Sequence, residues 1–123
     1  MKSIIMLFCF VFGFIGYSQA TEKEVLVSFE KIKSAIEIGV NYQTYTDYVV
    51  KLNTEINMHK REKKHNSKFI AKAEECLGFY KTAQDAWNLK VDPDMPDNMD
   101  SILENIIQTS WNKGSDCVDN LYK

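Results

Sequence analysis

The 123-residue chain contains only two prolines, five glycines and two histidines. The scarcity of helix-breaking residues leaves room for long helices, and it excludes a collagen-like or low-complexity chain. Neither sign of charge is in large excess, because 15 basic side chains stand against 17 acidic ones. Domains dedicated to nucleic-acid binding are normally strongly basic, so we expect no nucleic-acid partner.

Sequence motifs for metal binding and catalysis are also missing. The chain has no HExxH, CxxC or CxxCH motif, no GxSxG motif and no glycine-rich phosphate loop. His59 and His65 are six positions apart, which places them on different faces of a helix. We therefore expect a protein that is not an enzyme and that needs no metal ion or cofactor.

An acid-rich segment, residues 91–98, contains both prolines and is followed by Asp100. The EF-hand pattern fails in this segment, because Asp97 stands where that loop needs glycine and Leu103 where it needs glutamate. We interpret the segment as a solvated turn whose acids favour the start of the next helix, with weak calcium binding as the alternative.

The N-terminal sequence has the composition of an export signal. Lys2 precedes a 12-residue apolar run, residues 4–15, and small residues follow that run. This order is typical of a cleaved secretory signal peptide, with cleavage before Thr21 or, alternatively, before Gln19. The run is shorter than the roughly 20 residues that a membrane-spanning helix needs.

The predicted organisation is a signal peptide, residues 1–20, and a single domain, residues 21–123. No apolar stretch in residues 21–123 approaches membrane-spanning length. We therefore expect a bacterial protein that is exported to the periplasm or secreted, with no transmembrane span in its mature chain.

Four segments carry apolar residues at spacings of three and four, which is the period of an amphipathic helix. They cover residues 22–38, 42–64, 67–90 and 99–121. Short links between long amphipathic helices favour an all-α fold, an antiparallel up-down four-helix bundle.

Several residues of these helices lead to specific expectations. Val27 is expected to widen the buried face of the first helix. Gly78 is expected to permit close approach of a neighbouring helix, and Gly114 to kink or split the last helix. The predicted apolar stripe of the last helix includes Ile102, Leu103, Ile106 and Ile107.

Two cysteines, Cys76 and Cys117, remain after the signal peptide. An even pair in an oxidising compartment favours a disulfide. If the last two helices pair antiparallel, residues whose numbers sum to about 190 are neighbours. Cys76 then faces the region of Cys117 to within about one helical turn, which supports the pairing.

Four cations, Lys60, Arg61, Lys63 and Lys64, lie within five positions near the end of the second predicted helix. One interpretation is a solvated helix end stabilised by the helix dipole. The other is a contact with an anionic surface, such as lipid head groups, polysaccharide or an acidic partner.

Four aromatic residues, Tyr42, Tyr45, Tyr80 and Trp87, lie on the seams of the second and third helices. They are interpreted either as core packing or as an aromatic groove for a ligand or partner. The stretch from Gly39 to Tyr45 and the third-helix pattern that includes Tyr80 and Trp87 resemble a loose group of uncharacterised exported bacterial helical proteins. This resemblance implies no activity.

The predicted function is a noncatalytic exported helical bundle that binds or scaffolds another molecule in the cell envelope or outside the cell. The expected partner is a protein or an anionic envelope component. The alternative is a small-ligand carrier with an aromatic-lined cavity between its helices. A cavity lined by Tyr42, Tyr80 and Trp87 would favour the carrier, whereas a packed core with an exposed apolar stripe would favour partner binding.

Overall fold

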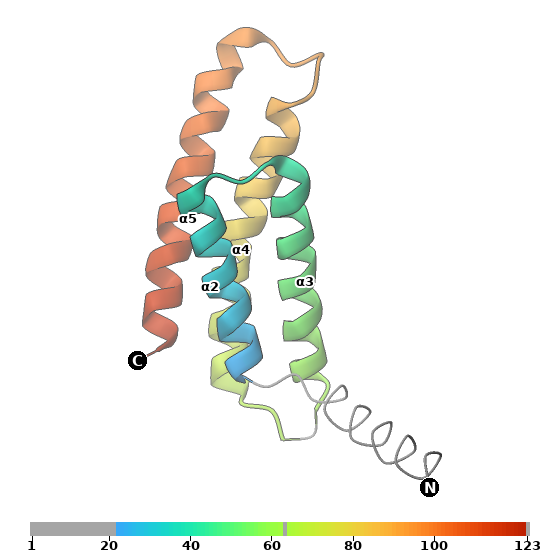
Figure 1. The fold of residues 1–123 in the computed structure, drawn as a ribbon, viewed down its shortest axis with the longest axis vertical. Helices are drawn as coiled ribbons and strands as arrows, with labels where there is room; N and C mark the ends of the chain where they lie inside the picture. The colour runs from blue at the N-terminus through green and yellow to red at the C-terminus, as the bar shows by residue number, and fades with distance from the viewer. Residues whose placement is uncertain (1–21, 63, 123) are drawn as a thin grey trace, which may run out of the picture.

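The computed structural model describes residues 22–62 and 64–122, and these residues form an all-helical fold (Figure 1). No strand occurs within the described residues. Four long helices pack against one another, which confirms the predicted four-helix bundle. The predicted signal peptide and its cleavage site lie outside the described residues, as does Lys63. The elements are α2 (Glu22–Ile38), α3 (Tyr42–Lys60), α4 (Ser67–Lys90), the short 3₁₀ helix η1 (Asp97–Met99) and α5 (Asp100–Leu121).

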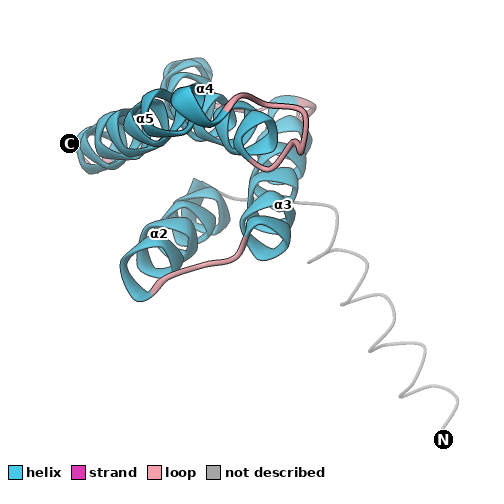
Figure 2. Ribbon diagram, turned by 90° about the horizontal axis from the view of Figure 1, so that it is seen from above, coloured by secondary structure: helices cyan, strands magenta, loops and turns pink. Residues whose placement is uncertain are grey.

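Consecutive helices run antiparallel, and α5 packs closely along α4 (Figure 1). Viewed from above, the four helices form an open arc with α2 and α5 at its two ends (Figure 2). α2 and α5 contact each other much less than either contacts its neighbour in the chain. The α4–α5 hairpin also extends beyond the link between α2 and α3 (Figure 1).

Local side chains set where these helices begin. Asn41 Oδ1 accepts a hydrogen bond from the Thr44 backbone N–H at 2.8 Å, and Asn66 Oδ1 accepts one from the Phe69 N–H at 3.1 Å. Such caps satisfy backbone N–H groups that have no partner inside the helix. α2 is followed by Gly39, whose φ of 105° is readily adopted only by glycine.

The second helix ends at Lys60, four residues before the predicted end. The chain must reverse direction between the end of α3 and the Asn66 cap that precedes α4, so the helix ends before the predicted position. The periodic pattern continued into the turn because lysine and arginine are good helix formers and do not mark a helix end.

The buried side chains follow the predicted seams on all four helices. They include Phe29, Ile32, Tyr45, Leu52, Ile56, Cys76, Leu77, Tyr80, Leu103, Ile107 and Val118. Three predicted core positions are wrong, because Val27 is 44% exposed, Ile102 51% and Ile106 38%. Helices at the ends of an arc are covered on fewer sides, so a narrower stripe of each is buried.

Neither Gly78 nor Gly114 has the role expected from the sequence. α5 runs unbroken through Gly114, and a Cβ atom at this position would lie 2.9 Å from Cζ of Tyr80. A Cβ atom at Gly78 would meet nothing within 4 Å. The close approach that was expected at Gly78 therefore occurs at Gly114, where packing of the Tyr80 ring outweighs the low helix propensity of glycine.

Replacing each glycine by alanine should separate these two situations. Gly78→Ala should raise the free energy of unfolding by about 1 kcal/mol, because alanine favours the helix and fits without a clash. Gly114→Ala gains the same helix propensity but must displace the buried Tyr80 ring. The two variants should therefore differ by about 1–3 kcal/mol in urea denaturation. Equal stabilisation of both would show that the Tyr80 ring yields without cost.

A disulfide joins α4 to α5 inside the core. The Sγ atoms of Cys76 and Cys117 are 2.07 Å apart, and both residues are buried. The pairing agrees with the predicted antiparallel register of the last two helices. A disulfide is compatible with an oxidising compartment.

None of the described helices combines the length and the apolar character that crossing a bilayer requires.

Candidate functional site

The structure describes three of the four cations of the predicted basic cluster. Lys60 forms an ion pair with Glu74 of α4, with Nζ and Oε1 3.5 Å apart. Arg61 and Lys64 are exposed on the turn that follows α3. Because Lys63 lies outside the described residues, the structure places three of the four cations, and one of these three already has an acidic neighbour.

Three of the four predicted aromatic residues pack against one another. The rings of Tyr42 and Tyr45 lie 5.5 and 5.7 Å from that of Trp87, within the range of stabilising aromatic pairs. Trp111 of α5 adds a fourth ring, 5.9 Å from Trp87. These four rings fill the space between α3, α4 and α5. None of Tyr42, Tyr45 and Trp87 lines any of the four main surface hollows in the described part of the chain.

The largest of these hollows lies on the outer face of α2, and we call it the α2 groove. It has a volume of about 530 Å³ and is bounded by Tyr48 of α3 and by Tyr122, the residue that follows α5. Its apolar lining from α2 comprises Leu26, Val27, Ala35 and Ile38. The groove is open to solvent, and Val27, Ile38 and Tyr122 are among the exposed large apolar side chains.

Lysines border the α2 groove. Lys23 and Lys31 line it, and neither forms an ion pair with another residue of 22–62 or 64–122. Both lysines and Val27 also line an adjoining hollow, whose other charged residues are Glu24 of α2 and Lys51 and Glu55 of α3. The acid in the groove, Glu30, is 3.8 Å from Lys33 Nζ. The apolar surface is therefore flanked by cations that the neighbouring side chains do not neutralise.

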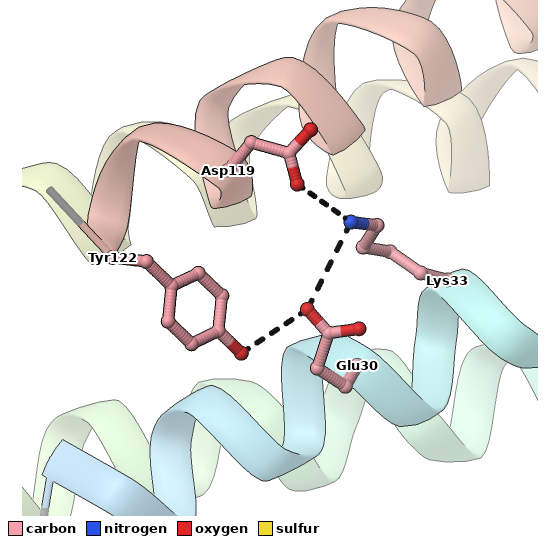
Figure 3. A network of polar contacts seen from close by, with 4 residues as sticks. All are labelled: Glu30, Lys33, Asp119 and Tyr122. Atoms are coloured by element: carbon pink, nitrogen blue, oxygen red, sulfur yellow. Dashed lines mark hydrogen bonds and ion pairs between the residues drawn. The ribbon is translucent and has the colours of Figure 1, made fainter.

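A polar network connects α2 to the end of α5 (Figure 3). Lys33 Nζ donates a hydrogen bond to Asp119 Oδ1 at 2.8 Å, and Tyr122 Oη donates one to Glu30 Oε1 at 3.1 Å. The hydrogen bond to Asp119 raises the pKa of Lys33, although partial burial opposes the shift. The side chains of Glu30 and Asp119 are 45% and 61% exposed, so these ion pairs add little to the free energy of unfolding. Their main effect is to hold the end of α5 against α2.

A second, smaller hollow lies between α2 and α5 beside this network, and we call it the α2–α5 cleft. Its volume is about 150 Å³. α2 contributes Lys33, Ile36 and Glu37 to its lining, and α4 contributes Tyr80. The lining from α5 consists of Gln108, Trp111, Asn112 and Ser115.

Tyr80 is the most deeply buried residue of the α2–α5 cleft. Its side chain is fully buried, and its Oη atom has no hydrogen-bond partner among the described residues. Burial raises the pKa of Tyr80, and the negative charges of Glu30 and Asp119 raise it further. The hydroxyl therefore stays protonated, in a region that carries negative charge.

The acid-rich segment forms a turn between α4 and η1. Asp92 Oδ1 accepts a hydrogen bond from the Asp94 backbone N–H at 2.9 Å, which is typical of an Asx turn. Within the described residues, no group of three or more His, Cys, Asp or Glu side chains is arranged to hold a metal ion. The geometry is that of a polar turn at the projecting end of the α4–α5 hairpin (Figure 1).

The sequence analysis missed most of the residues that line the two hollows. Lys23 and Lys31 are spread along one helix instead of forming a run, and Glu37 and Asn112 come from helices far apart in the chain. A signal was present at Val27, an apolar residue beside the main stripe of α2. Val27 marks a second, exposed face of α2 instead of widening the core.

Comparison of the chain with protein-family models, curated proteins and solved structures finds no match. The shape of the two hollows and the charges around them are therefore the observations that bear on function.

Proposed function

We propose that this protein is a noncatalytic exported binding module whose contact surface is the α2 groove. The proposed occupant is an amphipathic helix of a partner protein, with apolar side chains on one face and carboxylates beside them. Helix-in-groove recognition places such an apolar face in a hydrophobic groove.

The observation that carries the proposal is the exposed apolar lining of the α2 groove. Leu26, Val27 and Ile38 present apolar surface to solvent on one face of a short helix, between the rings of Tyr48 and Tyr122. Contiguous exposed apolar surface rimmed by polar residues is typical of interaction sites. Three of the aromatic seam residues, Tyr42, Tyr45 and Trp87, pack in contact with one another instead of lining a hollow, and this favours partner binding over ligand transport.

The charge of the partner follows from the lysines. Lys23 and Lys31 flank the apolar lining without ion pairs in the described part of the chain. α2 also begins at the end of the bundle where α3 reaches the basic cluster, so Arg61 and Lys64 add positive charge at that end (Figure 1). Complementary charge accelerates encounter and disfavours basic partners.

A model peptide tests this proposal. The probe is a labelled amphipathic peptide with a leucine stripe flanked by glutamates, and its counterpart carries lysines in place of the glutamates. Fluorescence anisotropy should show that the protein binds the acidic peptide and that added salt weakens binding. Val27→Asp should reduce affinity at least about tenfold, because it places a carboxylate in the apolar contact. Lys31→Glu should reduce it less and should remove part of the salt dependence.

Matched controls distinguish the α2 groove from the rest of the surface. Val50→Asp introduces the same change at an α3 residue that is 56% exposed and lines none of the four hollows. Lys81→Glu reverses an exposed charge on α4. Both controls should bind like the unmodified protein. The proposal is wrong if the lysine peptide binds as tightly as the acidic one, or if Val50→Asp weakens binding as much as Val27→Asp.

One observation favours the alternative function, a carrier of a small ligand. The α2–α5 cleft lies between helices and is reached by Tyr80, one of the four predicted aromatic groove residues. At about 150 Å³, this cleft is much smaller than the roughly 300–1,000 Å³ of typical drug-sized ligand pockets. A carrier of this design would transport only a very small molecule.

A further inference from the structure

The α2–α5 cleft contains a hydrogen-bonding group that the surrounding helices leave unpaired. Tyr80 Oη is buried and has no hydrogen-bond partner among residues 22–62 and 64–122. Nearly all buried polar groups in folded proteins are hydrogen-bonded, so an unpaired one favours any molecule that completes the bond. Tyr80 lines the cleft, so the cleft gives such a molecule access to this residue.

The charges around the α2–α5 cleft favour a cation. Glu37 lines the cleft and forms no ion pair in the described part of the chain. Glu30 and Asp119 share the ammonium group of Lys33 and act electrostatically on Tyr80 (Figure 3). Within the lining Glu37 and Lys33 balance each other, and Glu30 and Asp119 beside the cleft neutralise Lys33, so carboxylates outnumber lysines in and next to the cleft.

The remaining lining suits the rest of an organic cation. The rings of Tyr80 and Trp111 provide aromatic surface, and aromatic faces attract cations. Oxygen atoms of Gln108, Asn112 and Ser115 can accept hydrogen bonds from N–H groups. The volume of about 150 Å³ is close to that of an apolar cavity known to hold benzene, so a ligand of that size would fit.

We propose that the α2–α5 cleft binds a small organic ammonium ion. An N–H group of the ligand donates a hydrogen bond to Tyr80 Oη, its positive charge faces Glu37, and its alkyl part lies against Trp111. The linings of this cleft and of the α2 groove share no residue. The test of one proposal therefore does not decide the other.

Three probes of nearly equal size separate the effect of charge from that of shape: n-butylammonium, n-butanol and butyrate. Each is titrated into the folded, disulfide-bonded protein while the side-chain N–H signals of Trp111 and Asn112 are followed by ¹⁵N–¹H NMR. n-Butylammonium should produce saturable shifts with a Kd of about 1 mM, an affinity within reach of very small ligands. n-Butanol should bind more weakly, and butyrate should leave the signals unchanged.

Two variants test the named contacts. Glu37→Gln and Tyr80→Phe should each weaken n-butylammonium binding about tenfold, the loss expected for one hydrogen bond or contact to a charged group. Glu75→Gln and Tyr42→Phe are matched controls at residues that line neither the cleft nor the α2 groove, and they should not change the Kd. Glu37 is exposed, so Glu37→Gln should keep its melting temperature and stay interpretable even if Tyr80→Phe unfolds. Equal shifts from all three probes, or an unchanged Kd for Glu37→Gln, would overturn the proposal.

Discussion

Replacing Cys76 and Cys117 together by alanine should lower the free energy of unfolding by about 4 kcal/mol. The disulfide closes a loop with a sequence separation of 41 residues. In the chain-entropy model, removing a cross-link of this span increases the conformational entropy of the unfolded chain, and this stabilises the unfolded state by about 4 kcal/mol. The two residues are buried, so small cavities left by the alanines add to the loss. Urea denaturation followed by circular dichroism measures the difference.

The unmodified protein under reducing conditions is the matching control. Reduction should destabilise it by an amount similar to that of the double substitution, whereas the double variant should not respond to reductant. Mass spectrometry without reductant should detect no free thiol at Cys76 or Cys117 in the native protein. Two alkylatable cysteines, or a denaturation midpoint unaffected by reduction, would contradict the cross-link.

Leu77→Asp should prevent folding or reduce the free energy of unfolding by at least about 3 kcal/mol, because it buries an unpaired carboxylate. Leu77 is only 4% exposed and belongs to the core cluster between the helices. Ile106→Asp makes the same kind of change at a residue that is 38% exposed, and it should cost about 1 kcal/mol or less. Thermal melts of the two variants give the comparison.

This pair also tests the corrected face of α5. If Ile106→Asp were as destabilising as Leu77→Asp, the core would extend over the face of α5 that the structure exposes. Leu103 and Ile107 are among the buried residues of α5, so Ile107→Asp should behave like Leu77→Asp.

Hydrophobic periodicity was sufficient to predict the helices and their pairing. The bounds of α2 and α4 match the predicted segments, because each carries an apolar stripe that ends at a strong signal, Gly39 after α2 and the proline-containing segment after α4. The antiparallel register of α4 and α5 was also predictable, since a short link between two long helices leaves little freedom. That register brought Cys76 close to Cys117.

Periodicity could not show how many neighbours cover each helix. Val27 and Ile106 fit apolar stripes in the sequence, but their exposure depends on the open arc of the four helices. The role of Gly114 depends on the Tyr80 ring, a contact between different helices that helix propensity does not describe. For the same reason the Lys33–Asp119 contact could not be predicted, because its two residues are 86 positions apart.

The turn between α3 and α4 joins two helix pairs, of which one, α4–α5, is cross-linked by a disulfide. α4 and α5 are held by the disulfide, whereas the described structure has no such cross-link between α2–α3 and the rest. Arg61 and Lys64 are exposed in this turn, where trypsin-like proteases cut most readily. A single cut there would leave the α2–α3 piece attached only by packing, so the melting temperature of the nicked protein would depend on its concentration, as it does for a dimer.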